Sequence, residues 1–422
     1  MKRIAVIGAG VSGLTVAQQL KNRYVVKVFE KADRPGGLIK CERINGSLFH
    51  TCGGHVFNSK RQDVLDWFWS LFKREEEFSK TDRNSVVFMD KNNDSTEHID
   101  VPYPIENHMY CFSEGIQKSF IRDILNISYI GGGNPGNFEE FLKGRFGKTL
   151  YNIYFQPYNY KVWRRDLKNV PLSWLEGKLP MPTVEEMIYN NMNHVEEKSF
   201  VHAQFWYEKM NGSQFIAERL AQGLDITYNA DIAEIAKSGN KWLVNGEAFD
   251  RVIFCGNIKD MPKMVRGVNF DKYAKDIDAL EYHGTTAVFC EIDKNPYSWI
   301  YQPSQQHESH RIICTGNFSQ TNNDARLPSD RITATIEFTD EISEEAILDN
   351  LTRIPLHPIY ITHKYNKYTY PIQDAHTRDM IQCLKQDLSV YGLYFTGRFA
   401  DWEYYNMDVA MGAAMDMCKS LY

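Results

Sequence analysis

The chain has 422 residues, which is enough to bury a large core, and its 43% hydrophobic and 24% charged residues are ordinary for a globular protein. A formal net charge of −6 argues against nucleic acid as a partner, so an anionic ligand would have to meet local arginine or lysine. The sequence lacks any run of about 18 apolar residues that could span a membrane, and its eight cysteines lack C-x-x-C spacing, which favours a cytoplasmic protein with reduced thiols and no metal.

A glycine-rich motif opens the chain. A short apolar run at residues 3–7 is followed by Gly8, Gly10 and Gly13, and then by helical periodicity at residues 14–20. In this G-x-G-x-x-G arrangement the first glycine permits a tight turn, the second lets the backbone approach a pyrophosphate, and the third lets the helix pack closely on the sheet. The helix N-terminus would offer free N–H groups to phosphate oxygens.

An acidic residue completes this motif. A second apolar run at residues 25–29 ends in Glu30, about 20 residues beyond the glycines, where a carboxylate can bond to ribose hydroxyls. Strand, glycines, helix, strand and acid in this order predict a dinucleotide-binding site. Arg34 and Gly36-Gly37 follow directly, and this continuation resembles the FAD-binding start of the flavin amine oxidase superfamily. The resemblance favours FAD over NAD.

A second pair of glycines precedes a histidine. Gly53, Gly54 and His55 lie shortly before an amphipathic helix that is predicted at residues 64–72. Adjacent glycines indicate a backbone that bends or moves near another group. From these residues alone, the favoured interpretation of His55 is a loop histidine bonded to the backbone.

Residues 105–195 are predicted to form a helical insertion between parts of the nucleotide-binding domain. The helical patterns lie at residues 112–128, 137–160 and 183–191. Asn137 is the expected N-cap of the second helix, with Glu140 as the other half of a capping box.

Aromatic residues are concentrated at the end of that second helix and just after it, at Tyr158, Tyr160 and Trp163. Flat rings can hold a base or a sugar. The alternative is a tyrosine-rich helix core, which is the more usual meaning of aromatic residues at helical spacing.

The second half of the chain contains a series of strand patterns. They lie at residues 225–228, 241–245, 251–255, 284–292, 331–338 and 359–365. The run at 251–255 is expected to return to the first sheet, whereas those at 284–292 and 331–338 are expected to form a second, antiparallel sheet.

The C-terminal segment offers another anion site. The stretch that starts at Tyr370 is expected to open a helix that runs to about Ser389. A later strand ends in Gly397-Arg398, before an aromatic loop and a final helix. The N-terminus of that helix is a second place for a phosphate or a flavin ring.

Together these elements predict an α/β protein: a Rossmann-type FAD-binding domain with a helical insertion and a second, antiparallel sheet. We expect the FAD-binding domain at residues 1–100, 201–260 and 371–422, a helical substrate domain at 101–200, and an antiparallel-sheet substrate domain at 261–370.

The ordered segments resemble the UDP-galactopyranose mutase family over nearly the whole chain. The loop that begins at Gly53 is similar to the family's histidine loop, which lies against the isoalloxazine ring. Arg311 falls where the family has a diphosphate-binding arginine, and the segment from Gly397 to Tyr404 resembles its C-terminal signature.

Three departures from the family pattern concern the substrate. Lys178 stands where mutases have an arginine, His310 where many have a tyrosine, and Asn211-Gly212 where they have two glycines. Lysine is a point charge and arginine a planar fork, so the first departure weakens bidentate recognition of a diphosphate. The identity of the sugar nucleotide is therefore left open.

The resemblance implies a flavin-dependent isomerase that interconverts UDP-galactopyranose, or a related nucleotide sugar, and its furanose form for cell-surface polysaccharide biosynthesis. In the family the sugar is held as a covalent adduct with N5 of reduced FAD, without net redox. The implied catalytic residues are His55, Arg311 and Arg398. The residues expected to contact FAD are Gly8, Gly10, Gly13, Glu30, Arg34, Gly36, Gly37, Leu38, Ile232, Arg398, Asn406 and Met407. Those expected to contact the substrate are Tyr158, Tyr160, Trp163, Lys178, His310, Arg311, Tyr370 and Tyr404.

The expected partners are a nucleotide-sugar substrate and an external reductant for the flavin, and assembly into a homo-oligomer stays open. Two alternatives remain at this point. One is an FAD-dependent oxidoreductase of the amine oxidase or protoporphyrinogen oxidase type, and the other is a flavin- or sugar-nucleotide-binding protein without catalysis. An oxidase consumes oxygen with its substrate, whereas a mutase is inactive until its flavin is reduced.

Overall fold

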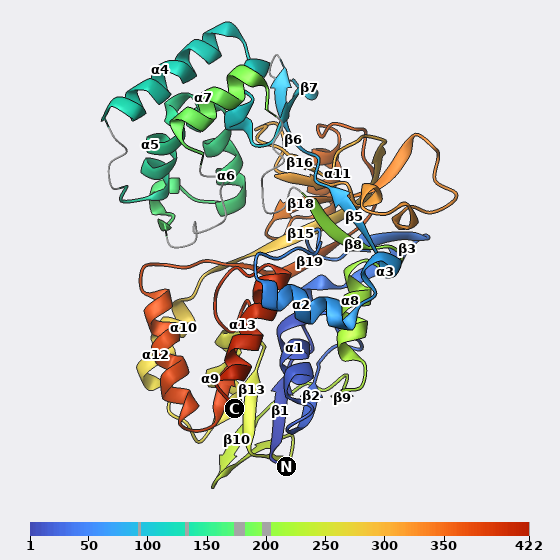
Figure 1. Ribbon diagram of the computed structural model, residues 1–422, viewed down its shortest axis with the longest axis vertical. Helices are drawn as coiled ribbons and strands as arrows, with labels where there is room; N and C mark the ends of the chain where they lie inside the picture. Colours follow the sequence, from blue (N-terminus) through green and yellow to red (C-terminus); the bar gives the residue numbers. More distant parts are fainter. Residues whose placement is uncertain (92–93, 131–134, 173–181, 196–203, 422) are drawn as a thin grey trace.

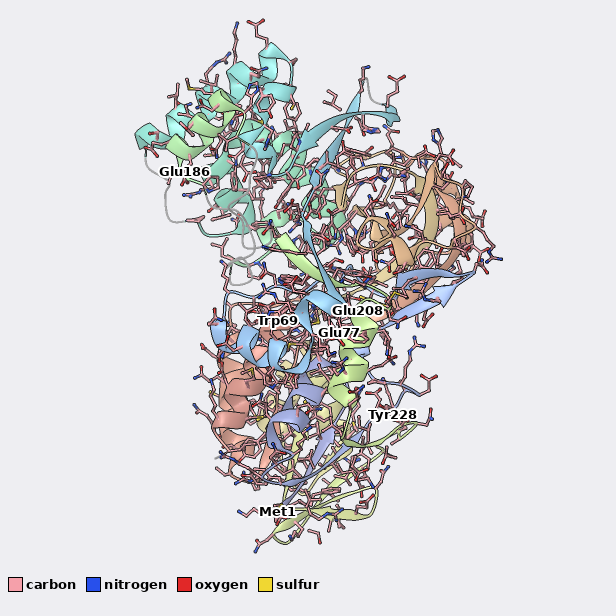
Figure 2. All side chains as sticks on the ribbon, turned by 45° about the vertical axis from the view of Figure 1, so that its right-hand side comes forward. Met1, Trp69, Glu77, Glu186, Glu208 and Tyr228 are labelled. Carbon is pink, nitrogen blue, oxygen red and sulfur yellow. The ribbon has the colours of Figure 1, made fainter. Side chains whose placement is uncertain are left out.

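The computed structural model describes residues 1–91, 94–130, 135–172, 182–195 and 204–421. Figure 1 shows an elongated molecule, with a parallel sheet and its helices at one end, helices α4 to α7 at the other, and a second sheet between them. Figure 2 marks the same axis, with Met1 near one end, Glu186 in the helical part, and Glu77 and Glu208 between them. Lys178, a predicted substrate residue, lies outside the described residues.

The first sheet has five parallel strands in the order β20-β13-β1-β2-β9. These strands are β1 (Arg3–Ile7), β2 (Val25–Phe29), β9 (Asp225–Thr227), β13 (Arg251–Phe254) and β20 (Leu393–Phe395). The return of residues 251–255 to this sheet is confirmed. Segments from the start, middle and end of the chain therefore meet in one sheet.

Both faces of this sheet are covered, which explains why its strands are apolar throughout. On β1, Ile4 and Val6 pack against one set of helices, whereas Ala5 and Ile7 point to the opposite face. The first face carries α1 (Val11–Leu20), α2 (Gln62–Leu71), α8 (Ser213–Ala221) and α13 (Met407–Lys419). The second face carries β10 (Ile235–Ser238), β11 (Lys241–Val244), β12 (Glu247–Phe249), β14 (Val265–Arg266), α9 (Met261–Met264), α10 (Asp271–Ala279) and α12 (Thr377–Ser389).

The second sheet has seven strands in the order β19-β15-β18-β17-β16-β6-β7, and all neighbours are antiparallel except β16 and β6. Its strands are β6 (Ser85–Lys91), β7 (Asp94–Pro102), β15 (Tyr282–Asp293), β16 (Trp299–Tyr301), β17 (Arg311–Ile313), β18 (Arg331–Thr339) and β19 (Ile359–Pro371). Helix α11 (Glu344–Leu351) packs against it. The predicted antiparallel strands at 284–292 and 331–338 are confirmed as β15 and β18.

The predicted helix start at Tyr370 is wrong. Strand β19 continues to Pro371 and pairs Tyr370 with His283 of β15, and α12 begins only at Thr377. Because β19 is an edge strand, a proline at its end leaves no ladder hydrogen bond unmade. This pairing places Tyr370 on the second sheet.

Two short antiparallel pairs complete the strands. They are β3 (Cys41–Ile44) with β4 (Ser47–His50), and β5 (Phe78–Asp82), which follows α3 (Arg74–Glu77), with β8 (Gln204–Glu208). The Phe49 ring of β4 stacks on Phe289 of β15, with 5.0 Å between centroids. This contact fastens the nucleotide-binding end of the chain to the second sheet.

The helical insertion is built on an aromatic core. It contains α4 (Glu114–Ile130), α5 (Phe138–Leu150), a π-helical turn (Tyr151–Phe155), α6 (Gln156–Trp163) and α7 (Val184–Asn193). The single helix predicted at 137–160 is broken, because Gly147 has a φ of 86° and a ψ of 163°. Asn137 caps α5 as predicted by accepting the Glu140 N–H at 3.0 Å, but the Glu140 carboxylate accepts from Gly136 instead of completing a capping box. None of the described helices is both long and apolar enough to cross a membrane.

Candidate active site

The glycine motif forms the turn that joins β1 to α1. Gly8 has a φ of 103°, which side chains other than glycine rarely adopt. A Cβ on Gly13 would lie 1.9 Å from the Gly8 carbonyl oxygen, so only glycine allows this helix start. A Cβ on Gly10 would meet no atom closer than 3.9 Å, which leaves room beside Gly10 for a ligand.

Glu30 lies beside this turn and is buried. Its carboxylate accepts the N–H of Ala9 at 2.6 Å and the N–H of Ala32 at 2.9 Å. Gly36 donates its N–H to the Ala9 carbonyl at 2.9 Å, and a Cβ on Gly37 would lie 3.2 Å from a Cα of the glycine motif. The acid and the second glycine turn therefore converge on the first, as a dinucleotide site requires.

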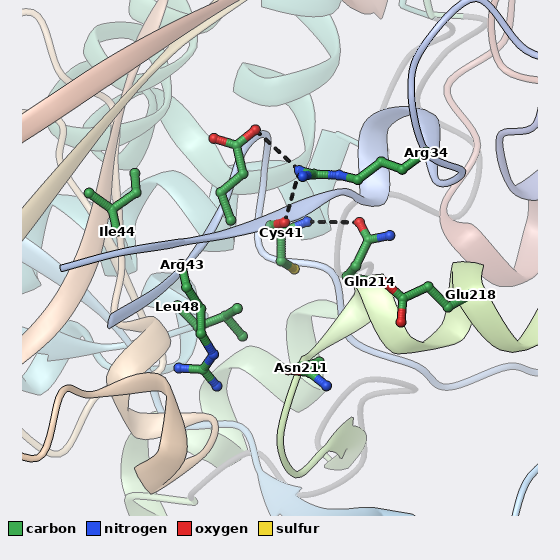
Figure 3. A pocket seen from close by; sticks show the side chains of 9 residues that line it. Arg34, Cys41, Arg43, Ile44, Leu48, Asn211, Gln214 and Glu218 are labelled. Atoms are coloured by element: carbon green, nitrogen blue, oxygen red, sulfur yellow. Dashed lines mark hydrogen bonds and ion pairs between the residues drawn. The ribbon is translucent and has the colours of Figure 1, made fainter. Parts of the chain in front are cut away.

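Arg34 and Ile232 lie away from that turn. Arg34 donates to the Cys41 carbonyl at 3.1 Å and to the Glu42 carboxylate at 3.2 Å. It lines a separate cleft of about 770 Å³ together with Gln214, as Figure 3 shows. The Ile232 side chain is buried in the core on the second face of the parallel sheet. The FAD contacts expected of both residues stay predictions.

A second cleft, of about 930 Å³, gathers residues from the second sheet, from the loop that follows β4, from the segment that follows β20 and from the start of α13. The predicted site residues that line it are His55, Arg311, Tyr370, Arg398, Tyr404, Asn406 and Met407. Asn406 and Met407 form the N-terminus of α13, which packs against α1 beside the glycine motif. The cleft is therefore continuous with the nucleotide-binding end of the molecule.

Arg311 of β17 is held by a buried carboxylate on the neighbouring strand. Its Nε donates to Glu337 Oε2 at 2.7 Å, and its guanidinium also donates to the Tyr370 hydroxyl at 3.2 Å. The other carboxylate oxygen accepts the Gly53 N–H at 3.0 Å. Burial lowers the pKa of Arg311, but Glu337 together with the neighbouring Tyr370, Tyr158 and Tyr404 outweighs burial and holds that pKa well above its ordinary value. One carboxylate thus fixes both a cationic cleft residue and the loop that carries His55.

Arg398 supplies the second guanidinium group. It donates from Nε to the Tyr405 carbonyl at 3.0 Å and from Nη1 to the Thr369 carbonyl at 3.3 Å. Its Cζ lies 4.6 Å from the centre of the Tyr404 ring, which stacks on Tyr370 with 5.2 Å between centroids and 2° between planes. Two guanidinium groups beside a stacked tyrosine pair form an arrangement suited to a diphosphate.

His55 is a neutral imidazole at the cleft. Burial, the neighbouring His50 and Arg398 lower the pKa of His55 to about 3. Its Nε2 is shielded from solvent and has no hydrogen-bond partner among the described residues. Leu38, another residue that is predicted to contact FAD, is half-buried in the turn Gly37–Ile39. The unpaired ring nitrogen leaves His55 able to bond to a bound group.

The remaining predicted substrate residues within the described part of the chain do not line the cleft. Tyr158 of α6 packs edge-on against Tyr301, a cleft residue, with 5.6 Å between ring centroids. Tyr160 is 51% exposed, and Trp163 and His310 are buried. Burial also lowers the pKa of His310 well below its ordinary value. The aromatic residues of α6 therefore serve largely as core, with Tyr158 reaching the cleft through Tyr301.

Two charged residues at the cleft were not found from the sequence. Glu337 lies in a strand with no exposed residue, and a glutamate inside a predicted buried strand is a signal for a paired charge. Arg83 donates to the Tyr301 hydroxyl at 2.6 Å and lies 4.9 Å from the Trp299 ring centre. Nothing in its polar sequence surroundings distinguishes Arg83 from a surface arginine.

Sequence comparison matches residues 6–74 to the NAD(P)-binding Rossmann-like domain. The chain is 21% identical to the dTDP-fucopyranose mutase of Escherichia coli, an alignment that covers 100% of this chain and 98% of that protein. It is 27% identical to a probable UDP-galactopyranose mutase of Klebsiella pneumoniae over 43% of this chain and 45% of that protein.

Solved structures with the same fold include the reduced form of a UDP-galactopyranose mutase, with a TM-score of 0.86, 21% identity, and coverage of 100% of this chain and 94% of that one. A putative protoporphyrinogen oxidase from Exiguobacterium has a TM-score of 0.75 and 14% identity, with coverage of 100% and 98%. Both structures share the fold of this chain, and the first superposes more closely.

Proposed function

We propose that this chain is a flavin-dependent pyranose mutase, which interconverts the pyranose and furanose forms of a nucleotide-linked hexose without net redox. The observation that carries the proposal is the second cleft, in which three guanidinium groups, a stacked tyrosine pair and a neutral histidine border one space. Such a cleft suits a substrate that carries a diphosphate between an aromatic base and a sugar.

FAD is the cofactor we propose, and reduced FAD is its active form. The residues present fit a dinucleotide, because room is left beside Gly10, the Glu30 carboxylate adjoins the glycine turn, and the N-termini of α1 and α13 lie at the same end of the parallel sheet. Reduced flavin supplies the nucleophilic and redox chemistry that these side chains lack. His55 would contact the flavin ring, since its Nε2 is otherwise unpaired among the described residues.

Arg311 and Arg398 would bind the diphosphate of the substrate. Their positive charges stabilise the nucleotide as it leaves the sugar and retain it in the cleft until it returns. Tyr370 and Tyr404 would donate hydrogen bonds from the same wall. We keep Tyr158 as part of the nucleotide platform because it packs on Tyr301, and Lys178 stays a predicted diphosphate ligand.

The test is anaerobic incubation of the purified protein with dithionite and a panel of nucleotide sugars, followed by chromatography for furanose products. UDP-galactopyranose and dTDP-fucopyranose head the panel, because these are the sugars named in the two mutase relatives. We expect conversion of at least one sugar after reduction and none before it. Oxygen consumption in proportion to an amine or porphyrinogen, without sugar conversion, would instead support an oxidoreductase.

The matched variants are Arg398→Ala and Arg61→Ala. Arg398 lies in the cleft, whereas Arg61 pairs with Asp63 and Asp416 at the surface. Losing a charge-assisted hydrogen bond to the substrate costs about 1.5–3 kcal/mol, so Arg398→Ala should lower turnover roughly tenfold or more. Arg61→Ala should turn over like the wild type.

A further inference from the structure

A buried lysine joins the helical insertion to the strands that carry Arg311. Lys161 lies on α6 and is only 6% exposed. Its Nζ donates to the carbonyl oxygens of Gln302 at 3.0 Å and Ser309 at 2.8 Å. Both acceptors are neutral, and within the described residues no carboxylate forms an ion pair with this ammonium group.

The two acceptors lie at the base of the connection between β16 and β17. Gln302 immediately follows Tyr301, and Ser309 precedes Arg311 by two positions. The Gln302 N–H donates to the His310 carbonyl at 3.0 Å, and the Ser309 hydroxyl donates to the Gln302 side chain at 2.7 Å. These two hydrogen bonds close the base of the connection. The ends of the connection adjoin Tyr301 and Arg311, which both line the cleft.

Helix α6 touches these strands at a second point. Tyr158, one turn before Lys161, packs edge-on against Tyr301. The lysine and the tyrosine together determine where the helical insertion lies relative to Arg311.

Packing alone does not explain a lysine at this position, because burying an ammonium group costs free energy that a methionine of similar length would not. The charged or titratable groups around Lys161 are Asp90 of β6, Arg164 after α6, and His307, Glu308 and His310 of the β16–β17 connection. Burial lowers the pKa of Lys161 to about 7; Asp90 and Glu308 oppose this by smaller amounts, and Arg164 lowers the pKa further. Burial also keeps both histidines neutral by lowering their pKa values, so the lysine is the group in this cluster whose charge changes near neutral pH.

We propose that Lys161 is a positioning residue, whose charged form holds the helical insertion at the spacing from Arg311 that a nucleoside diphosphate requires. When Lys161 loses its proton, its two hydrogen bonds lose their charge assistance and the spacing is held less firmly. The inference rests on the proposed function for the identity of the ligand, but its geometry does not depend on that function.

The experiment is calorimetric titration of the purified flavoprotein with UDP at about pH 6 and pH 8.5. Because UDP itself titrates, the quantity compared is the ratio of wild-type to Lys161→Met affinity at each pH. We expect the wild type to bind roughly tenfold more tightly at pH 6, and the ratio to fall below about threefold at pH 8.5. Lys118→Met, which replaces an exposed lysine of α4, should track the wild type at both values. A ratio that is near one, or equal at both values, would overturn the proposal.

A second measurement needs no nucleotide. Hydrogen exchange at the Gln302 amide should be faster in Lys161→Met than in the wild type at pH 6, because the carbonyl oxygens of Gln302 and Ser309 lose their donor. Equal exchange in the two proteins would overturn the positioning role even if wild-type protein failed to bind UDP. Failure of UDP binding in the wild type, with faster exchange in the variant, would overturn the proposed function alone.

Discussion

At the scale of single residues, the cleft depends on one buried carboxylate. Glu337 is 1% exposed and accepts hydrogen bonds from Arg311 and from the backbone of Gly53. Glu337→Gln keeps the shape of the side chain but leaves Arg311 without its counter-charge, and removing one partner of a buried pair costs about 3 kcal/mol or more. We expect the variant to unfold at a lower urea concentration than the wild type.

UDP should stabilise Glu337→Gln more than it stabilises the wild type, because its diphosphate replaces the missing negative charge. The measurement is urea unfolding of both proteins with and without UDP. Equal midpoints for the two proteins without ligand would show that Glu337 does not hold Arg311 in the way the structure indicates.

The glycine motif makes a second residue-scale prediction, since Gly10 and Gly13 differ in the space around them. A Cβ on Gly13 collides with the Gly8 carbonyl oxygen, whereas one on Gly10 makes only an ordinary van der Waals contact, 3.9 Å from the Gly37 Cα. Gly10→Ala should therefore fold normally yet retain less flavin, and Gly13→Ala should lose both fold and flavin. Circular dichroism together with the flavin-to-protein absorbance ratio distinguishes these outcomes, and full flavin occupancy in Gly10→Ala would refute a ligand beside Gly10.

At the scale of elements, the sequence predicted those structures whose signals are local. Residues 3–7 and 25–29 are apolar because both faces of their sheet are covered, so each strand is visible in its own composition. The break of the helix at Gly147 depends on packing against α4, where a Cβ would lie 2.5 Å from a side chain. The extension of β19 to Pro371 depends on pairing with a distant strand. Neither contact can be deduced from a local periodicity.

The site shows the same division between local and non-local signals. Arg398 was predicted from the local pattern of strand, glycine and aromatic loop and Arg311 from the family resemblance, and both line the cleft. Glu337 and Arg83 were missed because their roles come from the pairing of β17 with β18 and of β6 with β16, which joins segments far apart in the chain. Helical spacing alone does not say which aromatic ring faces a ligand. Tyr160, a predicted substrate residue, has an exposed ring.

A histidine network links three elements and predicts how stability depends on pH. His50 of β4 bonds through Nε2 to the Tyr207 hydroxyl of β8 at 2.8 Å and through Nδ1 to the Ser213 hydroxyl of α8 at 3.3 Å. Burial lowers the pKa of His50 from 6.5 to about 4. Between pH 6.5 and 4 the unfolded chain therefore binds a proton at His50 that the folded protein does not bind. The contribution of neutral His50 to the free energy of unfolding is fully present above pH 6.5 and is lost as the pH falls towards 4.

For this one group the free energy of unfolding should fall by up to about 1.4 kcal/mol per pH unit. The check is urea unfolding at several pH values between about 4.5 and 7.5 for wild type, His50→Gln and His376→Gln. His50→Gln should show a shallower dependence, whereas His376→Gln, at an exposed position, should keep the wild-type slope. Identical slopes in all three proteins would mean that His50 is protonated as readily in the folded state as in the unfolded chain.

At the scale of the whole molecule, the cleft is where the parts of the fold meet. The His55 loop, the second sheet and the start of α13 all contribute to it, and Figure 1 shows the helical insertion beyond them. A ligand bound there would contact all of these segments at once and add to the hydrogen bonds that already join them. Added FAD should therefore raise the melting temperature of the flavin-depleted protein, with about 2.7 kcal/mol of stabilisation at one hundred times the dissociation constant. Scanning calorimetry of depleted and reconstituted protein provides the check, and an unchanged melting temperature would contradict a bound dinucleotide.

The fold by itself does not choose between a mutase and an oxidase, because the solved structures that share it include both a UDP-galactopyranose mutase and a putative protoporphyrinogen oxidase. The feature of this chain that bears on the choice is the set of guanidinium groups in the cleft, Arg83, Arg311 and Arg398, each held in place by hydrogen bonds. Their presence favours an anionic substrate. A mutase differs from an oxidase because its flavin is reduced both before and after each turnover, with no net transfer of electrons.

Electron balance during turnover is therefore the most direct measurement of the central claim. The protein is reduced anaerobically with one equivalent of dithionite and mixed with a large excess of nucleotide sugar, while flavin absorbance and furanose product are followed together. The account predicts many product molecules per flavin, with the flavin still reduced at the end. Oxidation of one flavin for each product formed, or no furanose from any nucleotide sugar, would contradict it.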